Sequence, residues 1–206
     1  MKINNSFKER VRQVAIKQSK IYKNIFIDYQ YLICSYDFKK QDFYILSAEQ
    51  TNYLHLVGVN TFLTPKEFFT KCFNGTLEES DFDFSKKNTN PSVVKGSVRR
   101  KIQSLELLNN FFNQKLLIEE NFKKNNITCA IATSDNKITI GFTNGEYSRP
   151  KTLLKGNELK TNPINIHLIL SKKRNEKLFN TIIYGDKNTL KSFKNKIYHL
   201  LSNSLL

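Results

Sequence analysis

The sequence predicts an α+β protein in which N-terminal helices are followed by a four-stranded antiparallel sheet and a C-terminal helix. Three features of the 206-residue chain support this fold class. Apolar residues recur mainly at helical spacing in the first half, they alternate with polar residues after about residue 127, and helical spacing returns near residue 187. We expect the helices to cover one face of the sheet and to leave the other face free.

The first predicted helix covers residues 7–22 and is amphipathic, with apolar residues on one side and Lys and Arg on the other. Two extended segments follow at residues 29–35 and 43–47, and the polar residues 37–41 between them indicate a hairpin. The pattern leaves open whether these strands belong to an N-terminal extension or to the main sheet.

Two short helices are predicted next. Residues 47–57 form the first, with Ser47 and Gln50 in a capping box and Gly58 as its stop. The second begins with TPKE at residues 64–67, where threonine caps, proline takes the first helical position and glutamate reaches back to the cap. Lys66 therefore lies in the first turn of this second helix.

A longer helix is predicted from about residue 97 to 113, after a polar loop at residues 81–91. Arg99, Arg100 and Lys101 then fall in its first turn, where positive charge opposes the helix dipole. This placement indicates either a bound anion or solvated surface charge. The following residues, 116–122, are compatible with either helix or strand.

The four strands of the expected sheet are residues 127–133, 137–143, 164–171 and 178–184. Turn residues separate the first two, which predicts a hairpin, and a charged turn joins the last two. Asp186 caps the final helix, whose apolar residues recur at core spacing.

The chain is strongly basic, because 33 Lys and Arg oppose 18 Asp and Glu and give a formal net charge of +15. Such a charge raises the local concentration of polyanions and favours a nucleic acid or a phosphate-rich substrate. A Lys-rich background composition, a membrane surface or an acidic protein partner are the alternative explanations.

The three cysteines lie singly in apolar stretches, without a Cys-x-x-Cys pair or a neighbouring histidine that would indicate zinc. They are typical of reduced core residues. The N-terminus lacks the apolar run of a signal peptide, and no stretch reaches the length of a membrane span. We therefore expect a cytoplasmic protein that uses no metal and no cofactor and does not contact a membrane.

The three histidines are candidates for acid–base chemistry. In the helix at residues 47–57 the apolar side chains cluster on one side, so His55 points nearly opposite, toward solvent or a cleft. His167 is out of phase with the aliphatic residues of its predicted strand and projects from the opposite face, where it is a second candidate. His199 lies on the Lys-rich C-terminal helix, and we expect it to be solvated.

A basic segment at residues 145–154 is the second candidate feature. It is expected to form a proline-stiffened loop between two strands, and it gathers cations and hydroxyl groups in a short stretch. Arginine offers a planar fork to phosphate, lysine a point charge, and hydroxyl groups short donors. These groups are Tyr147, Ser148, Arg149, Lys151 and Thr152. The alternative is an ordinary basic turn.

Known nucleotide-binding and metalloenzyme motifs are missing from the sequence, including the Walker loop, His-Glu-x-x-His, Gly-x-Ser-x-Gly and Gly-x-Gly-x-x-Gly. Metal-free RNA cleavage requires none of these motifs. A base takes the 2′-hydroxyl proton, an acid protonates the leaving 5′-oxygen, and cations hold the phosphate as its charge grows. The residues of this chain suffice for that chemistry.

Two segments resemble a phage- and mobile-element-associated ribonuclease-like family of the Barnase–EndoU–colicin–RelE (BECR) class. YLHLVGV at residues 53–59, with Pro65 and a Phe pair after it, resembles the family's HLTG segment. ITIGF at residues 138–142, followed by RPKTLL at residues 149–154, resembles its LGF…PKSLL ending. The resemblance spans about residues 29–183. Val57 stands where the family usually has threonine, so any role of that hydroxyl is absent here.

This resemblance implies a helical part followed by a four-stranded antiparallel sheet, in agreement with the order of elements above. It also implies RNA cleavage, with His55 as acid or base and with Arg149, Lys151 and Thr152 as holders of the phosphate. We count Tyr147, Ser148, Lys66, Arg99, Arg100 and His167 as substrate-binding candidates. We divide the chain into a basic helical extension (1–28), a BECR-like nuclease domain (29–185) and a C-terminal basic helix (186–206).

The function predicted from the sequence is therefore a metal-independent endoribonuclease, with members of the class often acting as toxins or in conflicts between phage and host. RNA is the expected partner, and an acidic antitoxin or inhibitor and a second copy of the chain are further expected partners of the basic helices. The alternatives are a noncatalytic nucleic-acid-binding protein and a basic module that holds an acidic protein.

Overall fold

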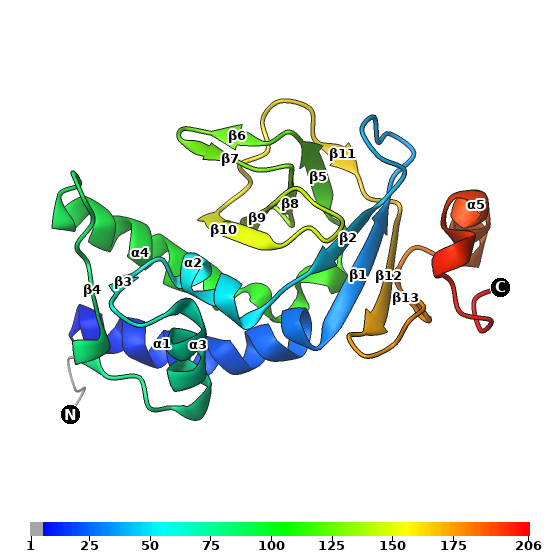
Figure 1. Cartoon of the computed structure of the whole chain (residues 1–206). Coiled ribbons are helices and arrows are strands. Elements are labelled where there is room, and N and C mark those ends of the chain that lie inside the picture. Colours follow the sequence, from blue (N-terminus) through cyan, green and yellow to red (C-terminus); the bar gives the residue numbers. More distant parts are fainter. Residues whose placement is uncertain (1–5) are drawn as a thin grey trace.

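The chain forms an α+β fold with its helices mostly N-terminal, as the computed structural model of residues 6–206 shows (Figure 1). The first five residues of the predicted N-terminal extension lie outside this description. The α-helices are α1 (Phe7–Tyr22), α2 (Tyr53–Val57), α3 (Pro65–Asn74), α4 (Pro91–Leu105) and α5 (Lys187–Ile197). A π-helical turn (Lys23–Ile27) extends α1, and 3-10 turns lie at Gln50–Asn52, Glu79–Asp81, Leu108–Asn113 and Tyr198–Leu200.

Two larger antiparallel sheets and two small hairpins, rather than one sheet, form the β-structure of the described residues. A four-stranded sheet has the order β13 (Thr181–Tyr184), β12 (Leu168–Lys173), β1 (Tyr29–Cys34) and β2 (Tyr44–Ser47). A five-stranded sheet has the order β10 (Pro150–Lys155), β9 (Ile138–Phe142), β8 (Ile131–Ser134), β5 (Leu117–Glu120) and β11 (Ile164–Asn165). Two small hairpins pair β3 (Asn60–Thr61) with β4 (Phe82–Asp83), and β6 (Lys123–Lys124) with β7 (Ile127–Thr128).

A four-stranded antiparallel sheet is present, but its strands are not the four predicted ones, because the strand expected at residues 164–171 is divided between the two sheets. Ile164 and Asn165 pair with β5, whereas the residues from Leu168 onward pair with β1 and β13. Ile166 and Ile169 join the largest core, and Leu168 and Leu170 join a second core under α5. Both faces of β12 are buried, so the aliphatic run does not reveal where the chain changes sheet.

The sheet face that was expected to be free is also covered. The largest core lies between α1–α4 and one side of the sheets, while α5 packs on the other side of the four-stranded sheet through Leu190, Phe193 and Ile197. A third cluster around Phe122 and Leu159 lies on the five-stranded sheet. Figure 1 shows α5 on the far side of β12 and β13 from the other helices.

The two sheets are connected along their edges. Ser148, just before β10, donates its backbone N–H to the Ile45 oxygen at 2.8 Å and accepts from the Ser47 N–H at 3.1 Å. At the other side, the His167 N–H donates to the Cys34 oxygen at 3.0 Å, between β11 and β12. These bonds fix the five-stranded sheet against β1 and β2, which positions β10 relative to the helices.

Helix α4 begins at Pro91 with Asn90 as its cap, six residues before the predicted start. Asn90 caps the helix and Pro91 takes its first position, but the sequence prediction assigned both residues to a polar loop. Arg99 and Arg100 therefore lie in the middle of α4, so the interpretation that they oppose the dipole of its first turn is wrong. The predicted segment 97–113 contains the end of α4 and a separate 3-10 turn.

The short helix α2 packs against α4 and β10. The capping box differs from the prediction, because Glu49 and Asn52 form it at the 3-10 turn Gln50–Asn52 that precedes α2, instead of Ser47 and Gln50. Gly58 ends α2 in the left-handed region at φ 78°, as the glycine stop predicted. The TPKE start of α3 is confirmed, with reciprocal hydrogen bonds between Thr64 and Glu67.

Candidate functional site

His55 lies on the outward side of α2, because Tyr53, Leu56 and Val57 turn inward and are buried. Its side chain is exposed toward solvent, as the helical spacing predicted. Partial burial lowers the pKa of His55, and the charges of Lys101 and Lys151 lower it further. Two ammonium groups from different elements therefore lie close enough to act on this imidazole, which is largely neutral near pH 7.

Lys101 comes from α4 and donates a hydrogen bond from Nζ to the backbone oxygen of His55. Its stem passes over Gly58, where an added Cβ would lie 2.6 Å from Lys101 Cδ. Burial lowers the pKa of Lys101 to about 8, with a smaller effect from the charge of Lys86. The sequence prediction placed Lys101 in the same basic run as Arg99 and Arg100 but counted only the two arginines as candidates, because only the tertiary packing of α4 on α2 distinguishes Lys101.

Lys151 and Thr152 lie in an edge strand, so the prediction that residues 145–154 form a loop is wrong for its second half. The pairing of β10 with β9 shifts register between Pro150 and Thr152, which leaves Lys151 as an extra, outward residue. Lys151 Nζ donates to the Thr128 oxygen at 2.8 Å. Thr152 is buried beside Gly141, where it packs instead of facing solvent.

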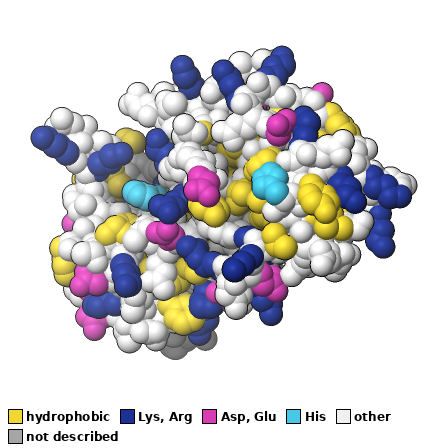
Figure 2. Space-filling model, turned by 45° about the vertical axis from the view of Figure 1, so that its right-hand side comes forward, with side chains coloured by type: hydrophobic (Ala, Val, Ile, Leu, Met, Phe, Trp, Pro, Cys, Tyr) yellow, Lys and Arg dark blue, Asp and Glu magenta, His cyan; other side chains and the backbone are white. Residues whose placement is uncertain are grey.

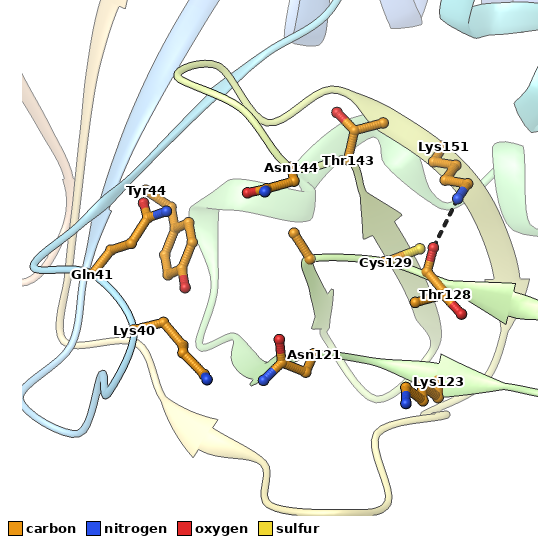
Figure 3. Close-up of a pocket in the computed structure, with 11 residues that line it drawn as sticks. Lys40, Gln41, Tyr44, Asn121, Lys123, Thr128, Cys129, Thr143, Asn144 and Lys151 are labelled. Carbon is orange, nitrogen blue, oxygen red and sulfur yellow. Dashed lines mark hydrogen bonds between the residues drawn. The ribbon is translucent and has the colours of Figure 1, made fainter.

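An open cavity of about 790 Å³ lies next to Lys151 (Figure 3). Its walls come from the segment before β2, from the β6–β7 hairpin and from the end of β9. The labelled side chains surround the cavity in Figure 3, with Lys40 and Tyr44 on one side and Lys151 and Cys129 on the other. The sequence prediction named only Lys151 among its lining residues, because the other walls are distant in sequence.

Lys66 lines a different cavity, and Arg149 is connected to that cavity through an ion pair with Glu49. Arg149 Nη2 forms an ion pair with Glu49 Oε1 at 2.8 Å, and Arg174 approaches the same oxygen at 3.9 Å. Glu49, Arg174 and Lys66 line a smaller cavity of about 350 Å³ at the base of α2 and α3. The charge of Arg149 is therefore partly compensated by Glu49.

The remaining candidates of the basic segment have different environments. Ser148 is buried, and its backbone bridges to β2, so its structural role there is to join the two sheets. Tyr147 is exposed next to it, with 37% of its surface accessible. The structure thus gives Tyr147, but not Ser148, a side chain on the surface.

Arg99 and Arg100 belong to the solvent side of α4. The Arg99 guanidinium lies 5.2 Å from the centroid of the Phe7 ring, which places Arg99 over α1. Arg100 is exposed, and its backbone oxygen accepts a hydrogen bond from Ser104 Oγ at 2.9 Å. Lys101 is thus the residue of this basic run that contacts α2.

His167 is in the connection between β11 and β12 and lines another hollow, together with Tyr36 and Lys115. Its ring centroid lies 4.4 Å from that of Tyr36, and Nδ1 is 3.3 Å from Ser35 Oγ. The lining of this hollow does not include Lys151 or His55. His167 therefore belongs to a group of residues distinct from those around α2.

Positive charge extends beyond these clusters. Figure 2 shows one face on which Lys and Arg side chains are numerous and are interspersed with hydrophobic and acidic ones. In a recessed part of this face, a histidine lies beside Lys or Arg side chains. Such a surface attracts polyanions and raises their local concentration.

Among residues 6–206, no three or more His, Cys, Asp or Glu side chains are grouped in a way that fits a metal ion. No helix in the same part of the chain combines the length and the apolar character needed to cross a bilayer.

Comparison with known proteins identifies one family. The model of the family described as phage-Barnase-EndoU-ColicinE5/D-RelE like nuclease4 matches residues 16–189, which include α2, α4, β10 and the cavity. No curated protein and no solved structure matches the chain.

Proposed function

The chain belongs to the phage-Barnase-EndoU-ColicinE5/D-RelE like nuclease family, and we propose that it cleaves RNA without a metal ion where α2, α4 and β10 meet. One observation carries this proposal. The imidazole of His55 has a lowered pKa because it is partly buried near the ammonium groups of Lys101 and Lys151. A neutral base beside two cations is the combination that phosphodiester cleavage requires.

In the proposed step, His55 removes the proton from a ribose 2′-hydroxyl. The 2′-oxygen forms a bond to phosphorus as the bond from phosphorus to the 5′-oxygen breaks. Lys101 donates a proton to the leaving 5′-oxygen, a role suited to an ammonium group with a pKa of about 8. The products are a 2′,3′-cyclic phosphate and a 5′-hydroxyl, with no net change in atoms or protons once the two side chains exchange protons with water.

Lys151 stabilises the charge that develops on the nonbridging oxygens. Its hydrogen bond to the Thr128 oxygen holds the ammonium group at the edge of the cavity and leaves its other N–H groups free to bind phosphate. A preorganised cation needs no reorganisation as the charge grows, so its effect on the rate is large. The buried Thr152 supports the strand that carries this lysine.

Cleavage of a labelled single-stranded RNA in excess chelator tests this function. The proposal expects the His55→Ala variant to lose roughly 10²- to 10⁴-fold in kcat, as for a removed general base. It expects Lys151→Ala to lose roughly 10²- to 10³-fold, as for a removed transition-state donor. The matched controls are His199→Ala, on the C-terminal helical segment, and Lys155→Ala, in the same strand as Lys151, and both retain activity.

Three outcomes of this assay contradict the proposal. Intact RNA at high concentrations of wild-type protein, together with tight salt-sensitive binding, identifies a noncatalytic RNA-binding protein. Activity that chelator abolishes and a divalent metal ion restores contradicts the metal-free step. Equal cleavage by wild type and His55→Ala removes His55 from the reaction.

A further inference from the structure

The cavity next to Lys151 is lined by groups that suit a nucleotide. Three lysines line it, Lys40 from the connection between β1 and β2, Lys123 from β6 and Lys151 from β10. Amide side chains add donors and acceptors, at Gln41, Asn121 and Asn144. Among the described residues that line it there is no Asp or Glu, so an anionic group entering the cavity meets no lining carboxylate.

The walls of this cavity are fixed by Glu120, which lies behind them. Its carboxylate accepts hydrogen bonds from the backbone N–H groups of Lys39 at 3.0 Å and Lys40 at 3.1 Å, and from the Tyr44 hydroxyl at 2.6 Å. The segment before β2 is thus held against the end of β5. On the adjacent wall, Asn121 in the left-handed region donates its backbone N–H to the Ala130 oxygen at 2.7 Å.

We propose that this cavity binds one unpaired nucleotide of the RNA substrate, next to the phosphate that is cut. The inference rests on the proposed function, because Lys151 belongs both to the cavity and to the proposed catalytic centre. A volume of about 790 Å³ falls within the range of small-molecule sites and accommodates a nucleotide with its hydration.

The lining assigns different contacts to the parts of this nucleotide. Lys40 and Lys123 bind phosphate oxygens on either side of the base, which adds affinity without sequence preference. The amides of Asn121 and Asn144 lie on the cavity wall and bind the edge of the base (Figure 3). A paired base cannot offer that edge, so the cavity selects single-stranded RNA over duplex RNA.

Binding of an RNA that cannot be cut tests the inference separately from catalysis. The probe is a fluorescently labelled single-stranded 2′-fluoro RNA, which lacks the attacking hydroxyl, and Kd is measured by anisotropy. We expect Lys123→Ala to raise Kd roughly 5- to 10-fold through a lost phosphate contact. The control is Lys124→Ala, which removes the same charge from the next residue, where the lysine pairs with Glu158 outside the cavity lining.

The amides are tested by the double variant Asn121→Ala/Asn144→Ala. We expect it to reduce the differences in Kd among four probes that each carry a different base. The inference is overturned if both cavity variants bind like Lys124→Ala, or if duplex and single-stranded probes bind the wild type equally. Equal melting temperatures of all variants establish that they are folded.

The test distinguishes a failure of the cavity from a failure of the proposed nuclease. Cavity variants that lose binding, in a protein that never cleaves RNA, support the nucleotide site and contradict the catalytic step. Cleavage that depends on His55, combined with unchanged binding by the cavity variants, supports the catalytic step and rejects the nucleotide site.

Discussion

The lowered pKa of His55 depends on residues that are far from it in the sequence. The exposure of His55 on α2 follows from local helical spacing, and the sequence predicts it correctly. The lowered pKa of His55 does not follow from local sequence, because its cause is burial together with the charges of Lys101 on α4 and Lys151 on β10. Lys101 was not selected as a site candidate for the same reason, since in the run SVRRK nothing local separates it from Arg99 and Arg100.

The two perturbed groups predict a bell-shaped pH dependence of kcat/KM. A base is active when deprotonated, and the pKa of His55 is lowered from its ordinary value of about 6.5. Activity therefore rises with pH along a limb whose midpoint lies below 6.5. An acid is active when protonated, so activity falls again as Lys101 loses its proton near pH 8. A pH–rate profile with the single-stranded RNA substrate measures both limbs.

Lys101→Arg separates the acid role of Lys101 from its charge. Arginine keeps the cation but stays protonated at all accessible pH values. We expect kcat to fall roughly 10²-fold or more, as for a removed general acid, and the alkaline limb to move away from pH 8. An unchanged profile in this variant would falsify the acid role.

Among the elements, those with local start and stop signals are predicted best. The cap of α3 and the glycine stop of α2 follow from hydrogen bonds within a few residues, and both are confirmed. β10 is not predicted as a strand, because proline begins it and a register shift interrupts its alternation. That register shift turns Lys151 outward, so the sequence prediction fails at a residue of the proposed catalytic centre.

The end of α2 allows a test of how one glycine positions Lys101. Gly58→Ala introduces strain at φ 78°, which costs about 1–2 kcal/mol, and lowers Tm by roughly 2–8 °C for a chain of this size. Its Cβ would also lie 2.6 Å from Lys101 Cδ, so the side chain must move away from His55. We expect a loss of activity in addition to the loss of stability.

Gly75→Ala is the matched control for this variant. Gly75 ends α3 at φ 75°, and a Cβ there meets no atom within 4 Å. Thermal melting should show similar losses for the two variants, while assays below Tm should show reduced activity for Gly58→Ala alone. Equal activities would mean that Lys101 need not occupy its place over Gly58.

For the fold as a complete unit, the α+β class and the order of its helices are predicted, but the partition into two sheets is not. The chain crosses between the sheets at Ile166–His167 inside one aliphatic run, and the first hairpin completes the four-stranded sheet. These are non-local pairings that composition and periodicity do not encode. The net charge of +15 does not depend on topology, and it favours polyanion binding whether the strands form one sheet or two.

The division of the chain into an extension, a nuclease domain and a C-terminal helix remains a proposal. α1 contributes Val11, Val14 and Ala15 to the same core as α2 and α4, so the nuclease unit that we propose includes α1. α5 packs on a separate core against the four-stranded sheet. The C-terminal helix is therefore the better candidate for an attachment that carries contacts to partners.

The mechanism depends on a 2′-hydroxyl as the attacking group, and a DNA oligonucleotide that contains a single ribonucleotide isolates that group. We predict that the protein in excess chelator cuts only on the 3′ side of the ribonucleotide and leaves a 2′,3′-cyclic phosphate, identified by mass spectrometry, and that His55→Ala does not. Cleavage of the all-deoxy strand, or a product with a free 3′-hydroxyl, would contradict 2′-hydroxyl attack at His55, Lys101 and Lys151.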